Sequence, residues 1–518
     1  MIVKFSMLVI FFAVMLYIGF LCRKSTTDVG GFVLGGRNVG PWLTAFAYGT
    51  SYFSAVVFIG YAGQFGWKYG IAATWAGIGN ALLGSFLAWK LLGRRTRVMT
   101  QHMNSATMPQ FFGTRFAAPK LKTASSLLIF VFLIPYTASL YNGLSRLFGM
   151  AFDIDYSVCV VAMAVLTGIY VIVGGYMATA VNDFIQGIIM LFGIVAVIFA
   201  VLKGEGGFVE AFQSLSRVQD PLVSDTPGVF ASFLGPDPVG LLSVVLLTSL
   251  GTWGLPQMVQ KFYAIKNEKA ISKGTVISTL FAAVVAGGCY FLGGFARLFS
   301  DRLTIVNGVP EGGYDTIIPT MLQPLPDILM AVVVILVLSA SMSTLSSLVL
   351  TSSSTLTLDL VCDVFAKKMG EKKKIFTMRF FVVVFIIISA VIAIVQHNSS
   401  VTFIAQLMGI SWGALAGAFL APFLYGLYWK KTTALSVLSN FAFSTLVMVL
   451  SMIKPEILPA LIRSPIQAGA FCMIAGLVVV PLVSLVTKAP EKEYIDSIFS
   501  CYQRKVTVVV TDSIGEES

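Results

Sequence analysis

The chain has 518 residues, of which 57% are hydrophobic and only 11% charged, and its mean hydropathy is +0.87. These values exclude a soluble globular protein and predict an all-α polytopic membrane protein. The net charge of +11 does not indicate nucleic-acid binding, because the basic residues collect in short loops between apolar runs instead of covering one face.

Thirteen apolar runs are long enough to cross the ~30 Å hydrocarbon core of a bilayer, which takes roughly 20 residues. They predict about thirteen transmembrane helices within a single domain, residues 1–487, followed by a short cytoplasmic tail, residues 488–518. The predicted spans are 4–22, 41–65, 71–93, 124–150, 156–175, 180–202, 239–257, 275–297, 326–356, 380–396, 402–428, 434–452 and 466–487.

The charges of the loops predict the orientation of the chain, because basic residues mark the cytoplasmic side of a membrane protein. If the N-terminus lies outside and the C-terminus in the cytoplasm, nearly every basic cluster faces the cytoplasm. These clusters are Arg23 and Lys24; Arg94, Arg95 and Arg97 with Lys120 and Lys122; Lys261, Lys266, Lys269 and Lys273; Lys367, Lys368, Lys372, Lys373 and Lys374; and Lys430 and Lys431.

Poor helix formers gather halfway along the second predicted span, where Gly49, Thr50 and Ser51 follow one another. This composition predicts a stretch of unwound backbone. Irregular backbone at membrane depth is tolerated where it is buried in protein or lines a watery cavity, and there its free carbonyl groups can coordinate a cation. The alternative is a helix that is kinked for packing alone.

The seventh predicted span is interrupted in the same way, by Gly251, Gly254 and Pro256. Each interrupted span opens a block of five spans. Residues 41–202 and 239–428 are therefore predicted to form the two halves of an inverted repeat, in which the corresponding broken helices build a site at the bilayer midplane. The hydrophobic periodicity alone does not establish this symmetry.

A run of hydroxyl residues follows the apolar stretch 328–338 in the ninth predicted span. Oxygens are the ligands of hard cations, and hydroxyl groups bind them without a charge that must be neutralised when the site empties. Small hydroxyl residues also let helices approach closely, so helix packing is the alternative. The residues that share one helix face at 3.6 residues per turn are Ala340, Ser343, Thr344 and Ser347, with Ser346 beside them.

Asp183 lies near the cytoplasmic end of the sixth predicted span. A carboxylate at this depth is unfavourable unless it is paired, solvated or bound to an ion, which makes Asp183 a candidate functional residue. The alternative is that it occupies the first turn of its helix, where an acid suits the helix dipole and reaches interfacial water.

Four motifs lie in order along residues 35–429. They are Gly35-Gly36-Arg37 before Pro41-Trp42; Tyr170-Val171-Ile172-Val173-Gly174-Gly175-Tyr176 followed by Asn182-Asp183 and Gln186; Ser343-Thr344-Leu345-Ser346; and Gly426-Leu427-Tyr428-Trp429. Together these motifs resemble the signature of the sodium/solute symporter family. The resemblance implies a LeuT-like fold, a five-plus-five inverted repeat with one extra helix before it and two after, and sodium-coupled uptake of small solutes.

Carried over position by position, the resemblance implies a main sodium site made of three carbonyl groups and two hydroxyl groups. These ligands are the carbonyls of Thr50, Phe53 and Ala340 and the hydroxyls of Ser343 and Thr344. A second sodium site, present in some branches of the family, is implied for Asp183, Ser343, Ser346 and Ser347. One or two coupled sodium ions are both compatible with the sequence.

The motifs say less about the identity of the transported solute than about the coupling ion. The proline branch of the family is similar around residues 41–54, but it has an aspartate where this chain has Tyr52. The aromatic pair of that branch on span seven falls near Thr248 and Thr252 here. Both differences weaken the case for proline.

The pantothenate branch shares the Lys68-Tyr69-Gly70 ending, the Asn182-Asp183 pair and the Gly254-Leu255-Pro256 segment. This similarity favours a small monocarboxylate as the substrate, and an amino-acid-like compound is the other candidate. Aromatic residues in the cavity would suit a partly apolar solute or act as gates. The residues expected to line or gate the substrate cavity are Tyr52, Ser54, Phe58, Tyr136, Tyr141, Thr252 and Trp253.

Other classes of membrane protein fit the sequence less well. An enzyme needs a nucleophile, a metal set or an acid–base pair at membrane depth, and one aspartate without histidines does not supply it. The remaining alternatives are an ion channel without coupled uptake, which usually carries a filter motif, and a transporter-like nutrient sensor, for which the tail is too short to form a signalling domain.

The sequence therefore predicts a symporter of the plasma membrane that is not an enzyme and binds no nucleic acid. Its expected partners are Na⁺ as the coupling ion, a small organic solute and the lipid bilayer, with no cofactor. A monomer is compatible with the sequence, which leaves the oligomeric state open.

Overall fold

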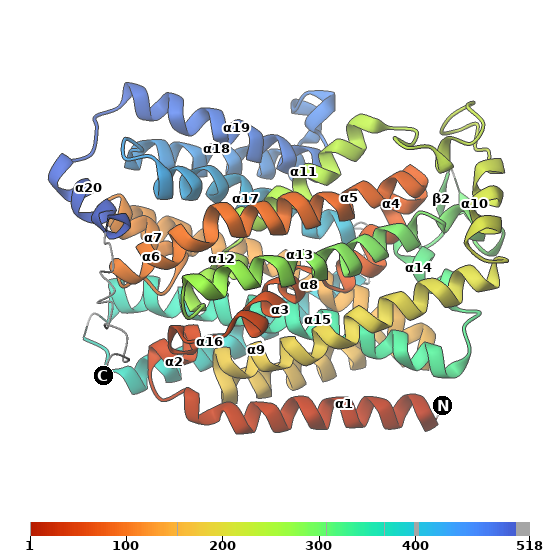
Figure 1. Ribbon diagram of the computed structural model, residues 1–518, viewed down its shortest axis with the longest axis horizontal. Helices are drawn as coiled ribbons and strands as arrows, with labels where there is room; N and C mark the ends of the chain where they lie inside the picture. The colour runs from red at the N-terminus through yellow and green to blue at the C-terminus, as the bar shows by residue number, and fades with distance from the viewer. Residues whose placement is uncertain (1, 153, 307, 367, 398–403, 504–518) are drawn as a thin grey trace, which may run out of the picture.

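The structure is a computed structural model that describes residues 2–152, 154–306, 308–366, 368–397 and 404–503. In these ranges the regular secondary structure is helical apart from one short hairpin, in which strand β1 (Ile305–Val306) pairs antiparallel with strand β2 (Val309–Pro310). Most long helices run along the long axis of the molecule, and the N-terminal end of the first helix lies at the end opposite to the last (Figure 1).

Twenty α-helices follow one another along the described chain. Those in the first half are α1 (Ile2–Leu21), α2 (Val29–Leu34), α3 (Pro41–Tyr52), α4 (Ala62–Tyr69), α5 (Thr74–Gly79), α6 (Arg94–His102), α7 (Met108–Arg115), α8 (Pro119–Phe152), α9 (Tyr156–Gly204) and α10 (Phe208–Arg217). Those in the second half are α11 (Pro238–Gly254), α12 (Pro256–Ala264), α13 (Glu268–Gly293), α14 (Ile317–Leu322), α15 (Asp327–Thr355), α16 (Glu371–His397), α17 (Ile404–Tyr428), α18 (Ala434–Ile453), α19 (Pro465–Val486) and α20 (Lys492–Phe499). Wider helical turns extend some of them, in η3 (Val56–Tyr61), η5 (Asn80–Leu87), η6 (Trp89–Gly93) and η10 (Leu356–Phe365).

Ten helices in the described part of the chain are long and apolar enough to cross a membrane, or up to eleven if the bent pair α11 and α12 counts as one span. The expected polytopic helical protein is confirmed, but helix length alone does not reproduce the predicted count of thirteen. Two of the ten, Val56–His102 and Tyr156–Gly204, are 47 and 49 residues long. Each contains a glycine with a positive φ, Gly70 at 61° and Gly175 at 54°.

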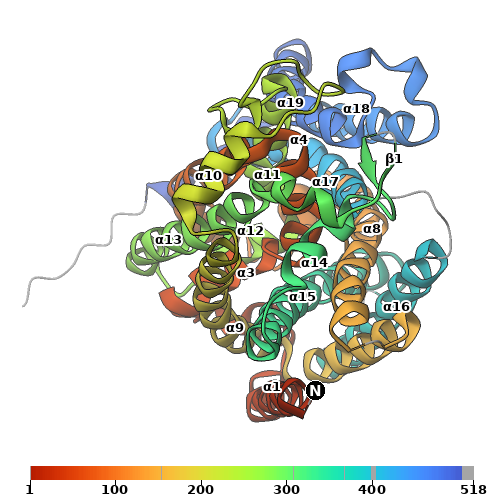
Figure 2. The same cartoon turned by 90° about the vertical axis from the view of Figure 1, so that its right-hand side faces the viewer.

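Burial separates the central helices from those at the periphery. In α17, 94% of the membrane-length window is buried, and in α15 83%, whereas the value for α1 is 22%. Figure 2 looks along the helices and shows α15 and α17 inside the bundle, with α1 at its edge. The hydroxyl residues of α15 therefore face other helices and not lipid.

The second predicted span is interrupted, as the sequence predicted. Helix α3 begins with Pro41, a favoured residue in the first turn, and ends at Tyr52. Phe53 then adopts an extended conformation, with φ −86° and ψ 113°, before the chain resumes in η3 and α4. Carbonyl oxygens of the last turn of α3 thereby lose their partners within the helix and are available to other groups.

The seventh predicted span is also interrupted. Helix α11 ends at Gly254, Leu255 is extended with φ −76° and ψ 124°, and α12 begins at Pro256 at an angle of 45°. Glycines seat α11 closely on α17: a Cβ atom on Gly251 would lie 2.6 Å from the ring of Trp412. A larger residue at this position would force the two helices apart.

Candidate functional site

The hydroxyl residues of α15 lie directly against the unwound end of α3. The Ser343 Oγ is 3.1 Å from the carbonyl oxygens of Thr50 and Ala340. The Thr344 Oγ1 is 3.0 Å from the carbonyl oxygen of Thr50, 3.3 Å from that of Phe53 and 3.1 Å from that of Ala340. All five residues are buried. The structure thus brings together every residue that the sequence assigned to the main sodium site.

This main cluster contains more acceptor oxygens than donor hydrogens. Its two hydroxyl groups carry one hydrogen each, yet they face three carbonyl oxygens in five close contacts. At most two of these contacts can be hydrogen bonds at one time. A monovalent cation among the five oxygens would convert the remaining acceptor–acceptor contacts into favourable ones, so the cluster is suited to a hard cation such as Na⁺.

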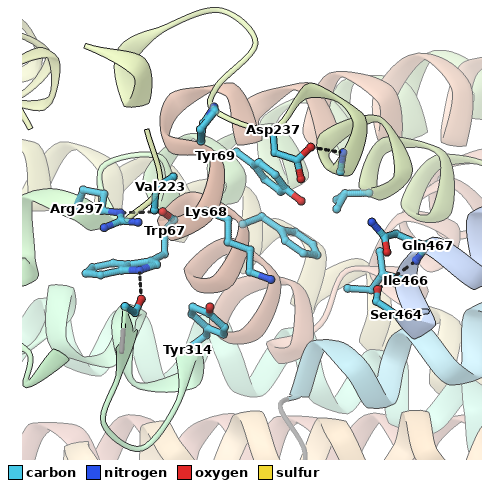
Figure 3. A pocket seen from close by; sticks show the side chains of 15 residues that line it. Trp67, Lys68, Tyr69, Val223, Asp237, Arg297, Tyr314, Ser464, Ile466 and Gln467 are labelled. Carbon is cyan, nitrogen blue, oxygen red and sulfur yellow. Dashed lines mark hydrogen bonds between the residues drawn. The ribbon is translucent and has the colours of Figure 1, made fainter. Parts of the chain in front are cut away.

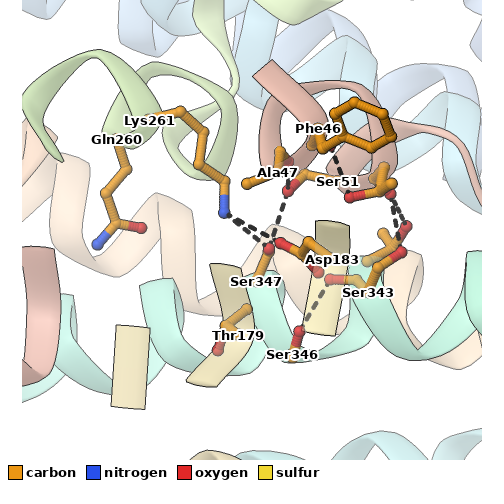
Figure 4. A network of polar contacts seen from close by, with 12 residues as sticks. Phe46, Ala47, Ser51, Thr179, Asp183, Gln260, Lys261, Ser343, Ser346 and Ser347 are labelled. Atoms are coloured by element: carbon orange, nitrogen blue, oxygen red, sulfur yellow. Dashed lines mark hydrogen bonds and ion pairs between the residues drawn. The ribbon is translucent and has the colours of Figure 1, made fainter. Parts of the chain in front are cut away.

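A second cluster centres on Asp183 of α9 (Figure 4). Asp183 is fully buried, and within the described ranges no residue donates a hydrogen bond to either of its carboxylate oxygens. The predicted partners of Asp183 point in different directions. The Ser346 Oγ donates to the carbonyl oxygen of Ser343 at 2.9 Å, and the Ser343 hydroxyl belongs to the main cluster. The Ser347 Oγ lies 2.9 Å from the Ser51 Oγ.

Lys261 of α12, which the sequence did not assign to any site, completes the second cluster. Its side chain is 1% exposed, its Nζ donates to the Ser347 Oγ at 3.0 Å, and it lies 3.9 Å from the Asp183 Oδ2. The prediction that Lys261 lies in a cytoplasmic loop was wrong, because α12 restarts at Pro256 and carries the lysine back into the bundle. Its position within two turns of that proline is the signal that could have revealed it.

Three aromatic rings lie together close to the unwound end of α3. The ring centroids of Tyr52 and Tyr136 are 6.3 and 6.0 Å from that of Trp412 on α17, and the Tyr136 hydroxyl is 3.5 Å from the Tyr52 carbonyl oxygen. Neither the Tyr52 hydroxyl nor the Trp412 N–H has a hydrogen-bond partner in the described part of the chain. Rings with uncommitted polar atoms suit a small, partly apolar solute. The sequence analysis named the two tyrosines as cavity residues but did not name Trp412.

The other residues predicted for the substrate cavity are buried but have different partners. Thr252 and Trp253 both donate to backbone carbonyl groups of η5, at 2.8 and 2.9 Å, so they attach α11 to that segment. The Ser54 Oγ accepts a backbone N–H at the start of η3, at 3.2 Å. Phe58 and Tyr141 are 0% and 1% exposed. Ser54 lies close to the Tyr136 hydroxyl, whereas Thr252 and Trp253 bind the backbone of η5.

A cavity of about 460 Å³ with both polar and apolar residues in its lining (Figure 3) lies near α4 and α14, at the end of the molecule opposite to α20 (Figure 1). Its lining comes from the end of α4, the segment before α11 and the first turns of that helix, the stretch between α13 and α14, and the start of α19. The Lys68 Nζ lies 5.2 Å from the ring centroid of Tyr314, and Arg297 forms an ion pair with Asp220 at 2.6 Å. The lining includes none of the seven residues predicted for the substrate cavity.

Arg37 connects separate segments of the chain at the end of the molecule that carries α20. The Arg37 guanidinium donates to the carbonyl oxygens of Thr100 at 3.3 Å and Tyr263 at 3.2 Å, and also to that of Ser105. Burial, and to a lesser extent the neighbouring charge of Arg97, lowers the pKa of Arg37 to about 10. Arg37 therefore stays protonated at neutral pH and links the segment before α3 to α6 and α12.

These features define the class of protein. Helices of membrane length enclose two interrupted helices, and an oxygen cluster suited to a monovalent cation lies at the first interruption. This combination is typical of secondary transporters, whose binding sites are built from discontinuous helices. The protein is accordingly a multi-pass transporter of the cell membrane.

The chain belongs to the sodium:solute symporter family, whose family model matches residues 32–443. Members of this family are transporters and not enzymes, and Na⁺ is their coupling ion. The resemblance noted in the sequence motifs is thereby confirmed.

Two bacterial transporters are similar to this protein over nearly the whole chain. The osmoregulated proline transporter OpuE of Bacillus subtilis (strain 168) is 29% identical over 494 residues, which cover 93% of this chain and 94% of the relative. A sodium/proline symporter of Staphylococcus aureus is 28% identical over 507 residues, covering 94% and 93%. Among solved structures, a Na⁺-coupled sialic acid symporter in a substrate-bound outward-open state matches with a TM-score of 0.71 at 16% identity, over 94% of this chain and 99% of that one. This last likeness shows that the two proteins share a fold.

Proposed function

We propose that the protein imports a small solute carrying a carboxylate group, either a monocarboxylate or an amino acid, together with sodium by alternating access. The observation that carries the proposal is the main cluster, in which five buried oxygens from α3 and α15 share only two hydroxyl hydrogens. A sodium ion bound there would join the unwound end of α3 to α15, and solute binding beside it would be coupled to the ion.

Two independent considerations support a carboxylate on the solute. The sequence motifs are similar to those of the pantothenate branch, and the named relatives transport proline. Pantothenate and proline each carry one carboxylate group. Close to the unwound end of α3, the Tyr52 hydroxyl and the Trp412 N–H are uncommitted donors of the kind that bind a carboxylate.

We also propose thirteen membrane crossings, arranged as a five-plus-five inverted repeat with the N-terminus outside. Dividing the two longest candidate spans at Gly70 and Gly175 adds two crossings to the ten, and the bent pair α11 and α12 adds one more. An odd number agrees with Figure 1, in which the N-terminal end of α1 and helix α20 lie at opposite ends of the molecule. The basic residues Arg97 in α6 and Arg37, which binds the α6 backbone, support a cytoplasmic location for the α20 end.

The test is solute uptake by purified protein in proteoliposomes, with proline, other amino acids, pantothenate, simple monocarboxylates and sugars as candidates. An inward sodium gradient is expected to drive accumulation of one carboxylate-bearing solute, and replacing sodium by choline or adding a sodium ionophore should abolish it. Sodium-independent passive flux would reject symport and favour a channel. Binding of a solute without any transport would favour a sensor.

A further inference from the structure

Lys261 introduces a positive charge where the sequence resemblance implies a second sodium ion. The second cluster is formed by three helices, with Lys261 on α12, Asp183 on α9 and Ser347 on α15 (Figure 4). All three side chains are at most 2% exposed. The lysine Nζ is 3.0 Å from the serine hydroxyl and 3.9 Å from the carboxylate.

The two charges of the second cluster depend on each other. A carboxylate inside a membrane protein is unfavourable unless a positive charge faces it, and an ammonium group likewise needs a facing negative charge. The oxygens of Asp183 receive no hydrogen bond from the described residues, so the Lys261 ammonium is the compensating charge that the structure provides. Ser347 in turn accepts one of the three ammonium hydrogens.

An ammonium group and a sodium ion make similar demands on their surroundings, because each carries one positive charge and each binds oxygen. We propose that the Lys261 ammonium occupies the second cation site as a cation tethered to the chain, so that the protein carries one sodium ion per transport cycle. This inference rests on the proposed function and adds the number of ions and the charge of the solute.

The number of ions limits which solutes can be concentrated. With a membrane potential of ~100 mV and a tenfold sodium gradient, one sodium ion supports roughly 500-fold accumulation of a neutral solute. For a monovalent anion the potential acts on no net charge, and about tenfold accumulation remains. A tethered second cation therefore narrows the substrate class to solutes that are neutral overall, such as zwitterionic amino acids, and disfavours simple monocarboxylate anions.

The competing explanation is that Lys261 and Asp183 only hold three helices together. A pair with that role affects folding, but its removal leaves the number of sodium ions per substrate unchanged. The ratio of sodium to substrate is therefore the measurement that separates the two explanations.

The experiment measures initial uptake of ²²Na⁺ and of labelled substrate in parallel in proteoliposomes. The wild-type protein is expected to take up one sodium ion per substrate. Lys261→Met removes the ammonium but retains a long side chain, and a sodium ion should then bind Asp183, which raises the ratio to two and makes the sodium dependence sigmoidal. Lys269→Met, at an exposed position of α13, is the matched control and should keep a ratio of one.

If Lys261→Met does not fold, Lys261→Gln takes its place, because it also removes the ammonium and should likewise show a ratio of two. Two further variants are controls. Lys261→Arg retains the positive charge, and the double variant Lys261→Met with Asp183→Asn removes both charges, so both should show a ratio of one. A ratio of two in the wild-type protein, or a ratio of one in an active Lys261→Met variant, would overturn the inference while leaving symport intact. Absence of sodium-dependent uptake in the wild-type protein would instead reject the proposed function.

Discussion

The two clusters on α15, one at Ser343 and Thr344 and the other at Ser347, lie about one helical turn apart but differ in charge. The main cluster offers only neutral oxygens, whereas the second contains a carboxylate that faces an ammonium group of the same chain. A neutral cluster can release its ion without leaving a buried charge uncompensated, but a buried carboxylate cannot. The comparison indicates that an exchangeable ion belongs in the main cluster and a permanent counter-charge in the second.

The largest effect is expected for Lys261→Met in the absence of sodium. The substitution leaves Asp183 buried without an opposing charge, which should lower the free energy of unfolding by about 3–5 kcal/mol. Sodium should restore part of this loss by binding the carboxylate. Thermal unfolding of the purified protein in choline chloride and in sodium chloride measures both effects, with Lys269→Met as the control. Equal stability of variant and wild type in choline would contradict the difference in charge between the clusters.

Asp183→Asn should have a smaller effect on stability, about 2 kcal/mol, because the Lys261 ammonium loses its opposing charge but keeps its hydrogen bond to the Ser347 Oγ. The half-saturating sodium concentration should stay within about twofold of the wild-type value. If Asp183 were itself a sodium ligand, the same variant would weaken sodium coupling. The sodium-to-substrate ratio in vesicles distinguishes the two outcomes.

Thr344→Ala or Ser343→Ala should act on sodium affinity more than on stability. Each removes one of five oxygens from the main cluster and should raise the half-saturating sodium concentration by roughly tenfold, which corresponds to about 1.4 kcal/mol. Sodium-dependent uptake measures this shift. Ser339→Ala is the control, because Ser339 is a buried hydroxyl on the same helix that has no partner in the described part of the chain. Unchanged sodium dependence in both variants would exclude the main cluster as the sodium site.

The smallest effect is expected for Ser346→Ala. The Ser346 hydroxyl donates to a backbone carbonyl at 2.9 Å, and hydrogen bonds of this kind within membrane proteins contribute about 0.6 kcal/mol on average. The half-saturating sodium concentration should therefore shift by less than about threefold, with an unchanged sodium-to-substrate ratio. A tenfold shift would instead make Ser346 a sodium ligand, as the family resemblance implies.

The main cluster could be located from the sequence because both of its parts leave local signals. The succession of Gly49, Thr50 and Ser51 indicated where α3 unwinds, and the spacing of Ser343 and Thr344 indicated which face of α15 is polar. The carbonyl ligands of Thr50 and Phe53 could not be recognised from residue type, because every residue has a backbone carbonyl group. Only the resemblance to the family selected those two residues.

The second cluster and the aromatic group depend on packing between distant segments, which the sequence does not reveal. Lys261 is followed by other lysines in the sequence, so it was assigned to a basic cytoplasmic loop. Only the bend at Leu255 brings it to Asp183. Trp412 lies among small and apolar residues of α17 and is distinguished only by its contact with Tyr52 and Tyr136. Helix lengths do not reproduce the predicted count of thirteen spans, because two of the helices run across the breaks at Gly70 and Gly175.

The 45° bend between α11 and α12 determines where Lys261 lies relative to Asp183. Helix α11 packs against α17 and α19, whereas α12 packs against α3, α6 and α15, so Leu255 joins two groups of helices. From Pro256 to Lys261 the helix rises by about 8 Å. A change of ~10° in the bend would move the start of the lysine side chain by about 1.4 Å over this arm length. Since the ammonium lies 3.9 Å from Asp183, such a small rotation suffices to tighten or open the ion pair while α11 keeps its place on α17.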